Sequence, residues 1–208
     1  MNNNTNQHLL REYLVLSYDK QTLQEQLQDP NFKGPVVLNG LFSESNTKNQ
    51  NGRIYPHPIL EREVNKFQEL IKENRAYGAL DHPSSSVVEL GNACHMIKEL
   101  RWDGNKLYGK TEILDTRPGK DLKAILKAGG SVGISSRSYG STNPIDEETE
   151  QVNEDLSLLT FDIVSQPSVA RAILSEGIVH NKKKIIIYPV NIDLKKLHES
   201  LDYIIREF

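Results

Sequence analysis

The sequence predicts an α+β domain in which several strands and two or three helices share one core. Short apolar runs typical of strands recur along most of the 208 residues. Helical spacing of apolar residues is confined to a few stretches, and strands and helices do not alternate regularly, which disfavours a doubly wound parallel sheet. We expect a disordered N-terminus over residues 1–8, one domain over residues 9–180, and a strand with an amphipathic helix over residues 181–208.

Strands are expected where apolar residues alternate or cluster between turn residues. Gly40 is expected at a bulge or a close backbone approach, Asn51-Gly52 at a turn, and Asp103-Gly104 at a hairpin. A polar, acidic stretch over residues 141–155 is interpreted as a surface loop. The expected strands lie within residues 11–19, 34–45, 87–114, 129–141, 156–174 and 181–190.

Helices are expected where apolar residues recur every three or four positions. The clearest covers residues 57–78, with Pro58 in its first turn and Gly78 at its exit. Shorter or later helices are expected over residues 21–30, 119–130 and 193–208.

The composition argues against a nucleic-acid-binding, membrane-spanning or secreted protein. A net charge of −3 gives no general basic surface for nucleic acid, and the three lysines at 182–184 are typical of a solvated strand end. No apolar run approaches the roughly 20 residues of a membrane span, and the first residues lack the features of a secretion signal. The single cysteine, Cys94, excludes an internal disulfide and fits a reducing compartment.

The segment GGSVGISSRSYGS, residues 129–141, concentrates five serines, four glycines and one arginine. A flexible linker would explain the glycines and serines. It would not explain the larger residues that alternate with them as in a strand: Val132, Ile134, Arg137 and Tyr139. The alternation favours a strand end that presents a serine nucleophile.

A serine nucleophile needs a neighbouring base, and His82 in LDHPSSS is a candidate. Pro83 biases His82 toward an extended backbone, and imidazole titrates near neutrality. The alternative is a loop histidine that bonds only to backbone.

A third group must orient the base, and Asp162 interrupts the otherwise apolar LTFDIV. It either faces solvent or meets a partner such as His82. Arg137 either supplies a fixed charge at the reacting oxygen or forms a surface ion pair with acidic residues 146–150.

Two rival sites use other residues. A metal site would draw on the set His57, Asp81, His82 and His95, whose spacing matches no compact ligand motif. A thiol nucleophile would use Cys94, although a lone cysteine is more typical of core packing.

Four segments resemble the prohead core proteases of tailed phages, and they occur in that family's order: NGLFSESNTKNQNGRIYP, GALDHP, GGSVGISSRSYGS and FDIVSQPS. The similarity covers Val36 to Ser168, about two-thirds of the chain. It implies a β-barrel serine protease fold of the herpesvirus maturation protease type, surrounded by helices, with residues 9–180 as the protease domain.

The resemblance also implies roles for individual residues. His82 of GALDHP matches the family's base, Ser135 rather than Ser136 its nucleophile, and Asp162 its orienting acid. Arg137 and backbone amides near Ser136 would stabilise the oxyanion. Ser138-Tyr139 departs from the family, whose members often carry glycine and a smaller apolar residue there.

The resemblance implies scaffold, core and capsid proteins as substrates, cut after glutamate with an aliphatic residue two positions earlier. ILSEGIV fits this preference, which predicts self-cleavage between Glu176 and Gly177. We expect action inside the viral procapsid, assembled in the host cytoplasm, with no cofactor, metal, membrane or direct nucleic-acid partner; a homo-oligomer is compatible with the family. The alternatives are a non-catalytic scaffold component with the same fold and a metal-dependent hydrolase.

Overall fold

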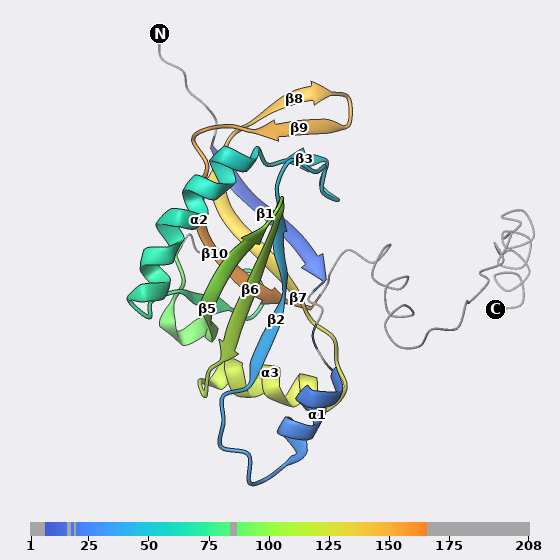
Figure 1. The fold of residues 1–208 in the computed structure, drawn as a ribbon, viewed down its shortest axis with the longest axis vertical. Helices are drawn as coiled ribbons and strands as arrows, with labels where there is room; N and C mark the ends of the chain where they lie inside the picture. Colours follow the sequence, from blue (N-terminus) through green and yellow to red (C-terminus); the bar gives the residue numbers. More distant parts are fainter. Residues whose placement is uncertain (1–6, 16–17, 19, 84–86, 166–208) are drawn as a thin grey trace, which may run out of the picture. The chain divides into compact units, whose positions relative to one another are not determined.

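The computed structural model describes residues 7–15, 18, 20–83 and 87–165, all of them within one compact unit, Met1–Ser175 (Figure 1). These residues form ten strands, three α-helices and one short 3₁₀ helix. In chain order they are β1 (His8–Val15), α1 (Lys20–Gln28), β2 (Val37–Glu44), β3 (Arg53–Ile54), α2 (His57–Lys72), β4 (Tyr77–Ala79), η1 (Leu90–Asn92), β5 (Ala93–Asp103), β6 (Lys106–Ile113), α3 (Arg117–Lys127), β7 (Gly133–Gly140), β8 (Thr142–Asp146), β9 (Thr149–Val152) and β10 (Ser157–Val164). The strand and helix predicted within residues 181–208 lie outside the described residues.

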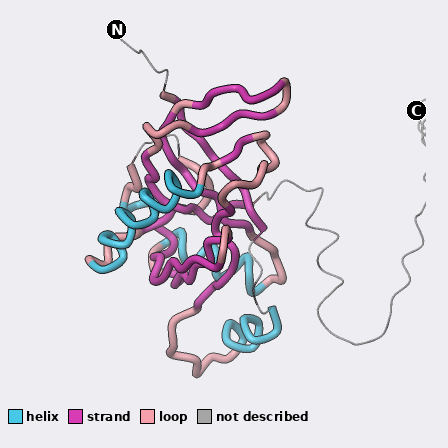
Figure 2. Tube along the Cα trace, turned by 45° about the horizontal axis from the view of Figure 1, so that its top comes forward, coloured by secondary structure: helices cyan, strands magenta, loops and turns pink. Residues whose placement is uncertain are grey.

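The strands, drawn in magenta in Figure 2, form three sheets, whose strand orders are β1-β7-β10, β2-β6-β5-β4 and β3-β9-β8. All ladders are antiparallel except the short β3–β9 pair. The predicted α+β class is therefore confirmed, as is the absence of a doubly wound sheet in this part of the chain.

The predicted closed barrel is not present as a continuous ladder in the described residues. The edges of the two larger sheets meet where Leu80, just after β4, forms a single parallel bridge with Ile163 of β10. The Asp81 N–H also donates to the Ile163 carbonyl at 2.7 Å. This junction brings β4 beside the strand that carries Asp162.

Aromatic side chains fill the space between α2 and the sheets. Phe161 of β10 packs against Phe42 of β2 and Phe67 of α2, with ring centroids 5.3 and 5.9 Å apart. Gly109 of β6 leaves room for the Phe42 ring, because a Cβ at Gly109 would lie 2.6 Å from it. The Phe67 ring is edge-to-face with Phe161 and the Phe42 ring is tilted to it, and such packing adds to the large apolar area that aromatic residues bury.

The helix α2 ends at Lys72, six residues before the predicted exit at Gly78. Asn74 adopts a left-handed backbone with φ 54° and donates to the Ile71 carbonyl at 3.0 Å, while Arg75 N–H donates to the Leu70 carbonyl at 2.8 Å. These bonds form a Schellman-type end in which asparagine replaces glycine. Gly78 instead lies inside β4.

Other boundaries also differ from the sequence prediction. Residues 141–155 contain the hairpin β8–β9 rather than an irregular loop; β8 is largely exposed, whereas β9 buries Thr149 and Val152. β1 begins at His8, within the predicted disordered terminus. The irregularity in β2 falls between Leu41 and Ser43 rather than at Gly40. The hairpin predicted at Asp103-Gly104 is confirmed: the β5–β6 turn follows Asp103, with Gly104 at φ 59°.

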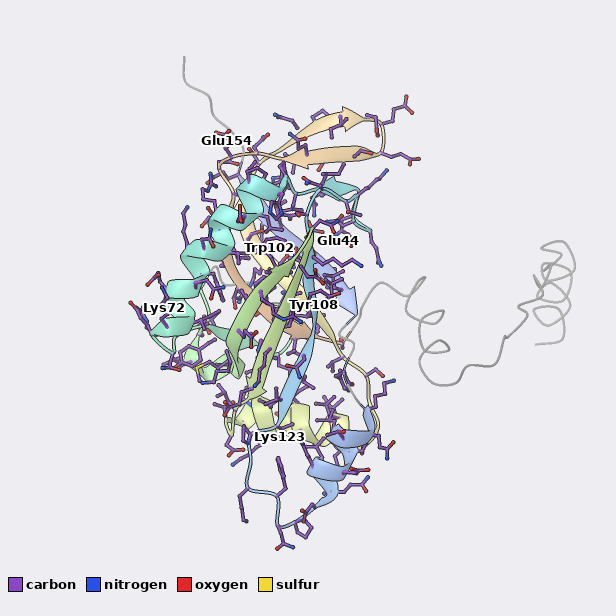
Figure 3. The ribbon with its side chains drawn as sticks, viewed as in Figure 1. Glu44, Lys72, Trp102, Tyr108, Lys123 and Glu154 are labelled. Atoms are coloured by element: carbon purple, nitrogen blue, oxygen red, sulfur yellow. The ribbon has the colours of Figure 1, made fainter. Side chains whose placement is uncertain are left out.

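Charged side chains cover the outer faces of the helices (Figure 3). Lys72 of α2 lies 2.7 Å from Glu69, and Lys123 of α3 lies 2.6 Å from Asp115. Among the described helices, none has the length and apolar character needed to cross a bilayer.

Candidate active site

Ser135 lies in β7, the central strand of its sheet, and is fully buried. It is directly opposite Asp162 of β10 on one side and Tyr13 of β1 on the other. Directly opposed residues of an antiparallel pair project to the same face. Pairing register therefore places a hydroxyl, a carboxylate and a phenol ring on one face of the sheet.

His82 reaches this face from the turn that follows β4. Asp81 has a left-handed backbone with φ 57°, and its carboxylate accepts a hydrogen bond from Ser165 N–H at 3.1 Å. This turn places His82 Nε2 2.7 Å from Ser135 Oγ and Nδ1 2.8 Å from Asp162 Oδ2. With Nδ1 donating to the carboxylate, Nε2 is the acceptor for the Ser135 hydroxyl proton.

Asp162 is held by donors on both carboxylate oxygens. Oδ1 accepts from Ala79 N–H at 2.9 Å and from Arg137 Nη2 at 3.2 Å, and Oδ2 lies 2.8 Å from Arg137 Nε as well as from His82. A fully buried carboxylate requires such compensation. The alternative of a solvent-facing Asp162 is wrong.

Arg137 is fully buried and paired with Asp162, so the surface ion pair with residues 146–150 is also wrong. Its guanidinium contacts the Asp162 carboxylate on the face of β7 that also carries Ser135, because residues two positions apart in a strand project to the same side. Ser136 lies between them and projects to the opposite face of the strand, away from His82.

Tyr13 is a site residue that sequence reasoning missed. Its ring stands edge-on to the His82 imidazole, with centroids 5.4 Å apart and an interplanar angle of 71°. Alternation in REYLV places Arg11 and Tyr13 on one face, but only the pairing of β1 with β7 shows that this is the face of Ser135.

The residues of the rival sites are dispersed. His57 Nδ1 lies 2.8 Å from Ser45 Oγ, and His95 Nδ1 lies 2.5 Å from Thr111 Oγ1. No three potential ligand side chains converge among the described residues. Cys94 is fully buried, and burial raises the pKa of its thiol far above the ordinary value, so its thiol is poorly suited to be a nucleophile.

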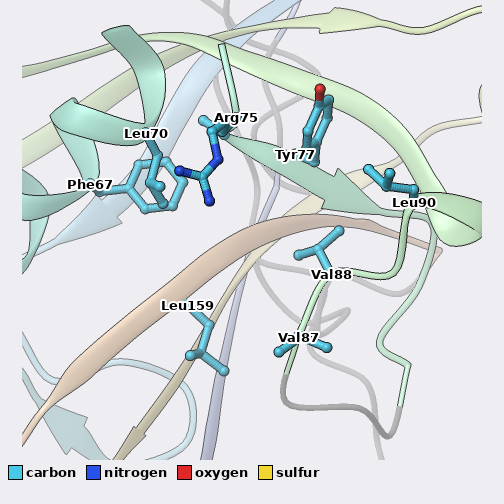
Figure 4. A pocket seen from close by; sticks show the side chains of 9 residues that line it. Phe67, Leu70, Arg75, Tyr77, Val87, Val88, Leu90 and Leu159 are labelled. Carbon is cyan, nitrogen blue, oxygen red and sulfur yellow. The ribbon is translucent and has the colours of Figure 1, made fainter. Parts of the chain in front are cut away.

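A hollow of about 410 Å³ lies on the other side of β10 (Figure 4). It is lined mainly by apolar side chains from α2, β4, β10, η1 and the segment just before η1, including Phe67, Leu70, Val87, Val88, Leu90 and Leu159. Phe67 contacts Phe161, which neighbours Asp162 and so projects to the opposite face. This hollow is therefore separate from the Ser135 face.

Comparison with known proteins identifies the family. The model of the family described as "Prohead core protein serine protease" matches residues 16–183. The chain belongs to this family. The matched region of this prohead core protease includes His82, Ser135 and Asp162.

Two comparisons with bacteriophage T4 agree with this membership. The chain is 34% identical to the prohead core protein protease of Enterobacteria phage T4 over 149 residues, 70% of each chain. The structure of the bacteriophage T4 capsid assembly protease, gp21, matches with a TM-score of 0.65 at 27% identity, over 77% of this chain and 99% of the T4 chain. The resemblance to phage prohead core proteases is thus confirmed.

Proposed function

We propose that this prohead core protease is a serine endopeptidase in which Ser135 is the nucleophile, His82 the general base and acid, and Asp162 the orienting carboxylate. The observation that carries the proposal is the continuous relay of 2.7 Å and 2.8 Å contacts from hydroxyl to imidazole to buried carboxylate. Family membership supports the same reaction class.

In the proposed reaction Ser135 Oγ attacks the scissile carbonyl while its proton moves to His82 Nε2. The tetrahedral intermediate collapses as His82 returns the proton to the leaving amine, which departs and leaves an acyl-enzyme on Ser135. Water then attacks the ester while its proton moves to His82; His82 passes this proton to Ser135 Oγ as the ester C–O bond breaks, which releases the acid product and restores the free serine. Asp162 stabilises the imidazolium in both steps without itself being protonated.

Oxyanion stabilisation by Arg137 and by backbone amides near Ser136 is part of the proposal. Arg137 lies on the reacting face, which supports an electrostatic contribution. Its pairing with Asp162 favours a second role, as a positioning residue that holds the carboxylate against His82.

We propose scaffold, core and capsid proteins as substrates, cut after glutamate inside the procapsid during head maturation in the host cytoplasm. The name of the T4 capsid assembly protease supports the substrate class. We predict that the protein acts without a membrane, nucleic-acid or cofactor partner and that it assembles as a homo-oligomer. We also predict a barrel of the herpesvirus maturation protease type, and the bridge between Leu80 and Ile163 supports this prediction.

Self-cleavage between Glu176 and Gly177 is proposed as well. Both residues lie outside the described part of the chain. Ser165, however, is bonded to Asp81 next to the base, and Glu176 follows it by only eleven positions. Bringing so short a segment back to Ser135 costs little loop entropy.

Paired variants test the nucleophile. Ser135→Ala is expected to abolish cleavage of scaffold protein and labelling by a serine-directed phosphonate, whereas Ser136→Ala keeps both. Free and procapsid-assembled protein should both be assayed, in case activity depends on assembly. Full activity of Ser135→Ala would remove the assignment, and an unlabelled wild type in both states would favour the non-catalytic scaffold component.

Mass spectrometry of the same incubated samples reads the chain itself. The wild type is expected to lose the segment from Gly177 onward while Ser135→Ala stays intact. If the wild type cleaves scaffold protein but its own Glu176–Gly177 bond stays intact, self-cleavage is refuted and the assignment of Ser135 as the nucleophile is unaffected.

A further inference from the structure

Arg11 is a second arginine on the face of the sheet that carries Ser135. It lies in β1 directly opposite Arg137, and it is two residues from Tyr13, which is directly opposite Ser135. The β1–β7 ladder has no irregularity between these pairs. Arg11 therefore projects to the same side as Ser135 and Tyr13, the side on which His82 packs.

The two opposed arginines differ in their partners. Arg137 is neutralised by Asp162. Arg11 is partly buried; its Nε is shielded from solvent and forms no hydrogen bond, and its guanidinium forms no ion pair with any residue in the described ranges. Like charges directly opposite each other in a sheet are destabilising, and a shielded charged donor without an acceptor is costly.

The carboxylate nearest in sequence is committed elsewhere. Glu12 faces the opposite side of β1, where it accepts hydrogen bonds from Tyr55 at 2.7 Å, Arg53 at 2.9 Å and Asn51 at 2.6 Å. Glu12 therefore leaves the charge of Arg11 uncompensated on the reacting face.

We propose that Arg11 binds the acidic side chain of the substrate residue whose carbonyl Ser135 attacks. The inference rests on the proposed serine peptidase and assigns a specificity-determining residue to it. Diagonal neighbours on adjacent strands have Cα atoms roughly 7–8 Å apart, which a long arginine side chain spans. A carboxylate there would accept charge-assisted, bidentate hydrogen bonds and relieve the opposition of the two arginines.

A different arginine, Arg75, is less suited to this role. Arg75 borders the apolar hollow behind β10, on the far side from Ser135, and is already paired with Glu73 at 2.8 Å. An acidic substrate side chain bound there would lie away from the nucleophile.

Matched peptides test the inference. They differ only at the residue before the scissile bond, which is Glu, Gln or Lys. We expect the wild type to prefer Glu over Gln by about 10- to 100-fold in kcat/KM, the range of a charge-assisted hydrogen bond. Arg11→Gln should bring this ratio close to one with little change on the Gln peptide, Arg11→Lys should retain part of it, and Arg11→Glu should favour the Lys peptide.

Two controls distinguish a failure of the proposed role of Arg11 from a failure of the proposed serine peptidase activity. Arg101→Gln removes an exposed arginine of β5 that lies 5.2 Å from the Tyr108 ring, and should leave the ratio unchanged. Phosphonate labelling of Ser135 should persist in Arg11→Gln and Arg11→Lys, which would show that the nucleophile still reacts. Normal labelling together with an unchanged Glu preference in Arg11→Gln, or a wild type indifferent to Glu, would overturn the role of Arg11. A wild type without label would overturn the peptidase itself.

Discussion

At the scale of single residues, Asp162 combines two functions that depend on its negative charge. It accepts from His82, which sets the imidazole tautomer, and it neutralises the buried guanidinium of Arg137. Ala79 N–H adds a backbone donor at 2.9 Å. The Asp162 carboxylate is thus held by contacts from β4, from β7 and from the turn that carries His82.

Asp162→Asn should lower kcat by about 10³- to 10⁴-fold, because a neutral amide no longer enforces the tautomer in which Nε2 accepts the Ser135 proton. It should also destabilise the fold by about 3–5 kcal/mol, since the buried guanidinium of Arg137 loses the negative charge of Asp162 beside it. Steady-state kinetics and urea unfolding measure the two effects. Asp103→Asn, at an exposed turn, is the control; wild-type kcat in Asp162→Asn would contradict the proposed role.

At the scale of elements, β4 lies where the β1-β7-β10 and β2-β6-β5-β4 sheets meet, and the turn after it carries His82, the proposed base. Gly78 makes this possible, because a Cβ there would lie 2.1 Å from His95 Nε2 and 2.2 Å from the Phe161 carbonyl oxygen. The next residue, Ala79, donates to Asp162, and the turn after it carries His82. The close approach of the backbone at Gly78 therefore determines where His82 lies relative to Asp162.

Gly78→Ala should destabilise the protein by about 1–3 kcal/mol through overpacking, and lower activity because β4 must shift. Gly91→Ala is the matched control: a Cβ at Gly91 meets nothing within 4 Å, so its effect should stay within about 0.5 kcal/mol. Urea unfolding midpoints compare the two. Equal stability of both variants would show that β4 can move away from β10 at no cost.

At the scale of the whole molecule, folding buries ionisable groups that the unfolded chain exposes to water. Burial lowers the pKa of His95 from 6.5 to about 4, although the Asp162 charge and the Phe161 carbonyl partly oppose the shift. The imidazole is therefore neutral in the folded core at pH values where the unfolded chain binds a proton. This difference links the stability of the fold to pH.

The free energy of unfolding should fall as the pH drops from about 6.5 toward 4, with a contribution from His95 of about 3 kcal/mol. Above pH 6.5 His95 is deprotonated in both the folded and the unfolded state, so the free energy of unfolding is not reduced by its protonation. Urea unfolding at several pH values measures the trend, and NMR titration of the His95 ring identifies its source. A ring that titrates near pH 6.5 in the folded protein would contradict the prediction.

Local sequence signals were sufficient for most elements. The strand around Ser135, the helix beginning near Pro58 and the β5–β6 hairpin at Gly104 are all present. Periodicity and turn residues act over a few neighbouring positions, so they are readable without a fold. The β8–β9 hairpin was missed because polar residues are equally typical of loops.

Local sequence identified the candidate side chains: a serine in a strand, a histidine before a proline and an aspartate in an apolar run, in the order seen in one protease family. Which of these side chains face one another depends on the pairing of the strands in the fold. Strand register placed Asp162 and Tyr13 opposite Ser135 and put Arg137 on the same face, where it pairs with Asp162, while Arg11 forms no ion pair with the described residues. Register depends on pairing between distant strands: Tyr13 and Ser135 are more than 100 positions apart and Ser135 and Asp162 are 27 apart, a long-range relation that no local pattern encodes.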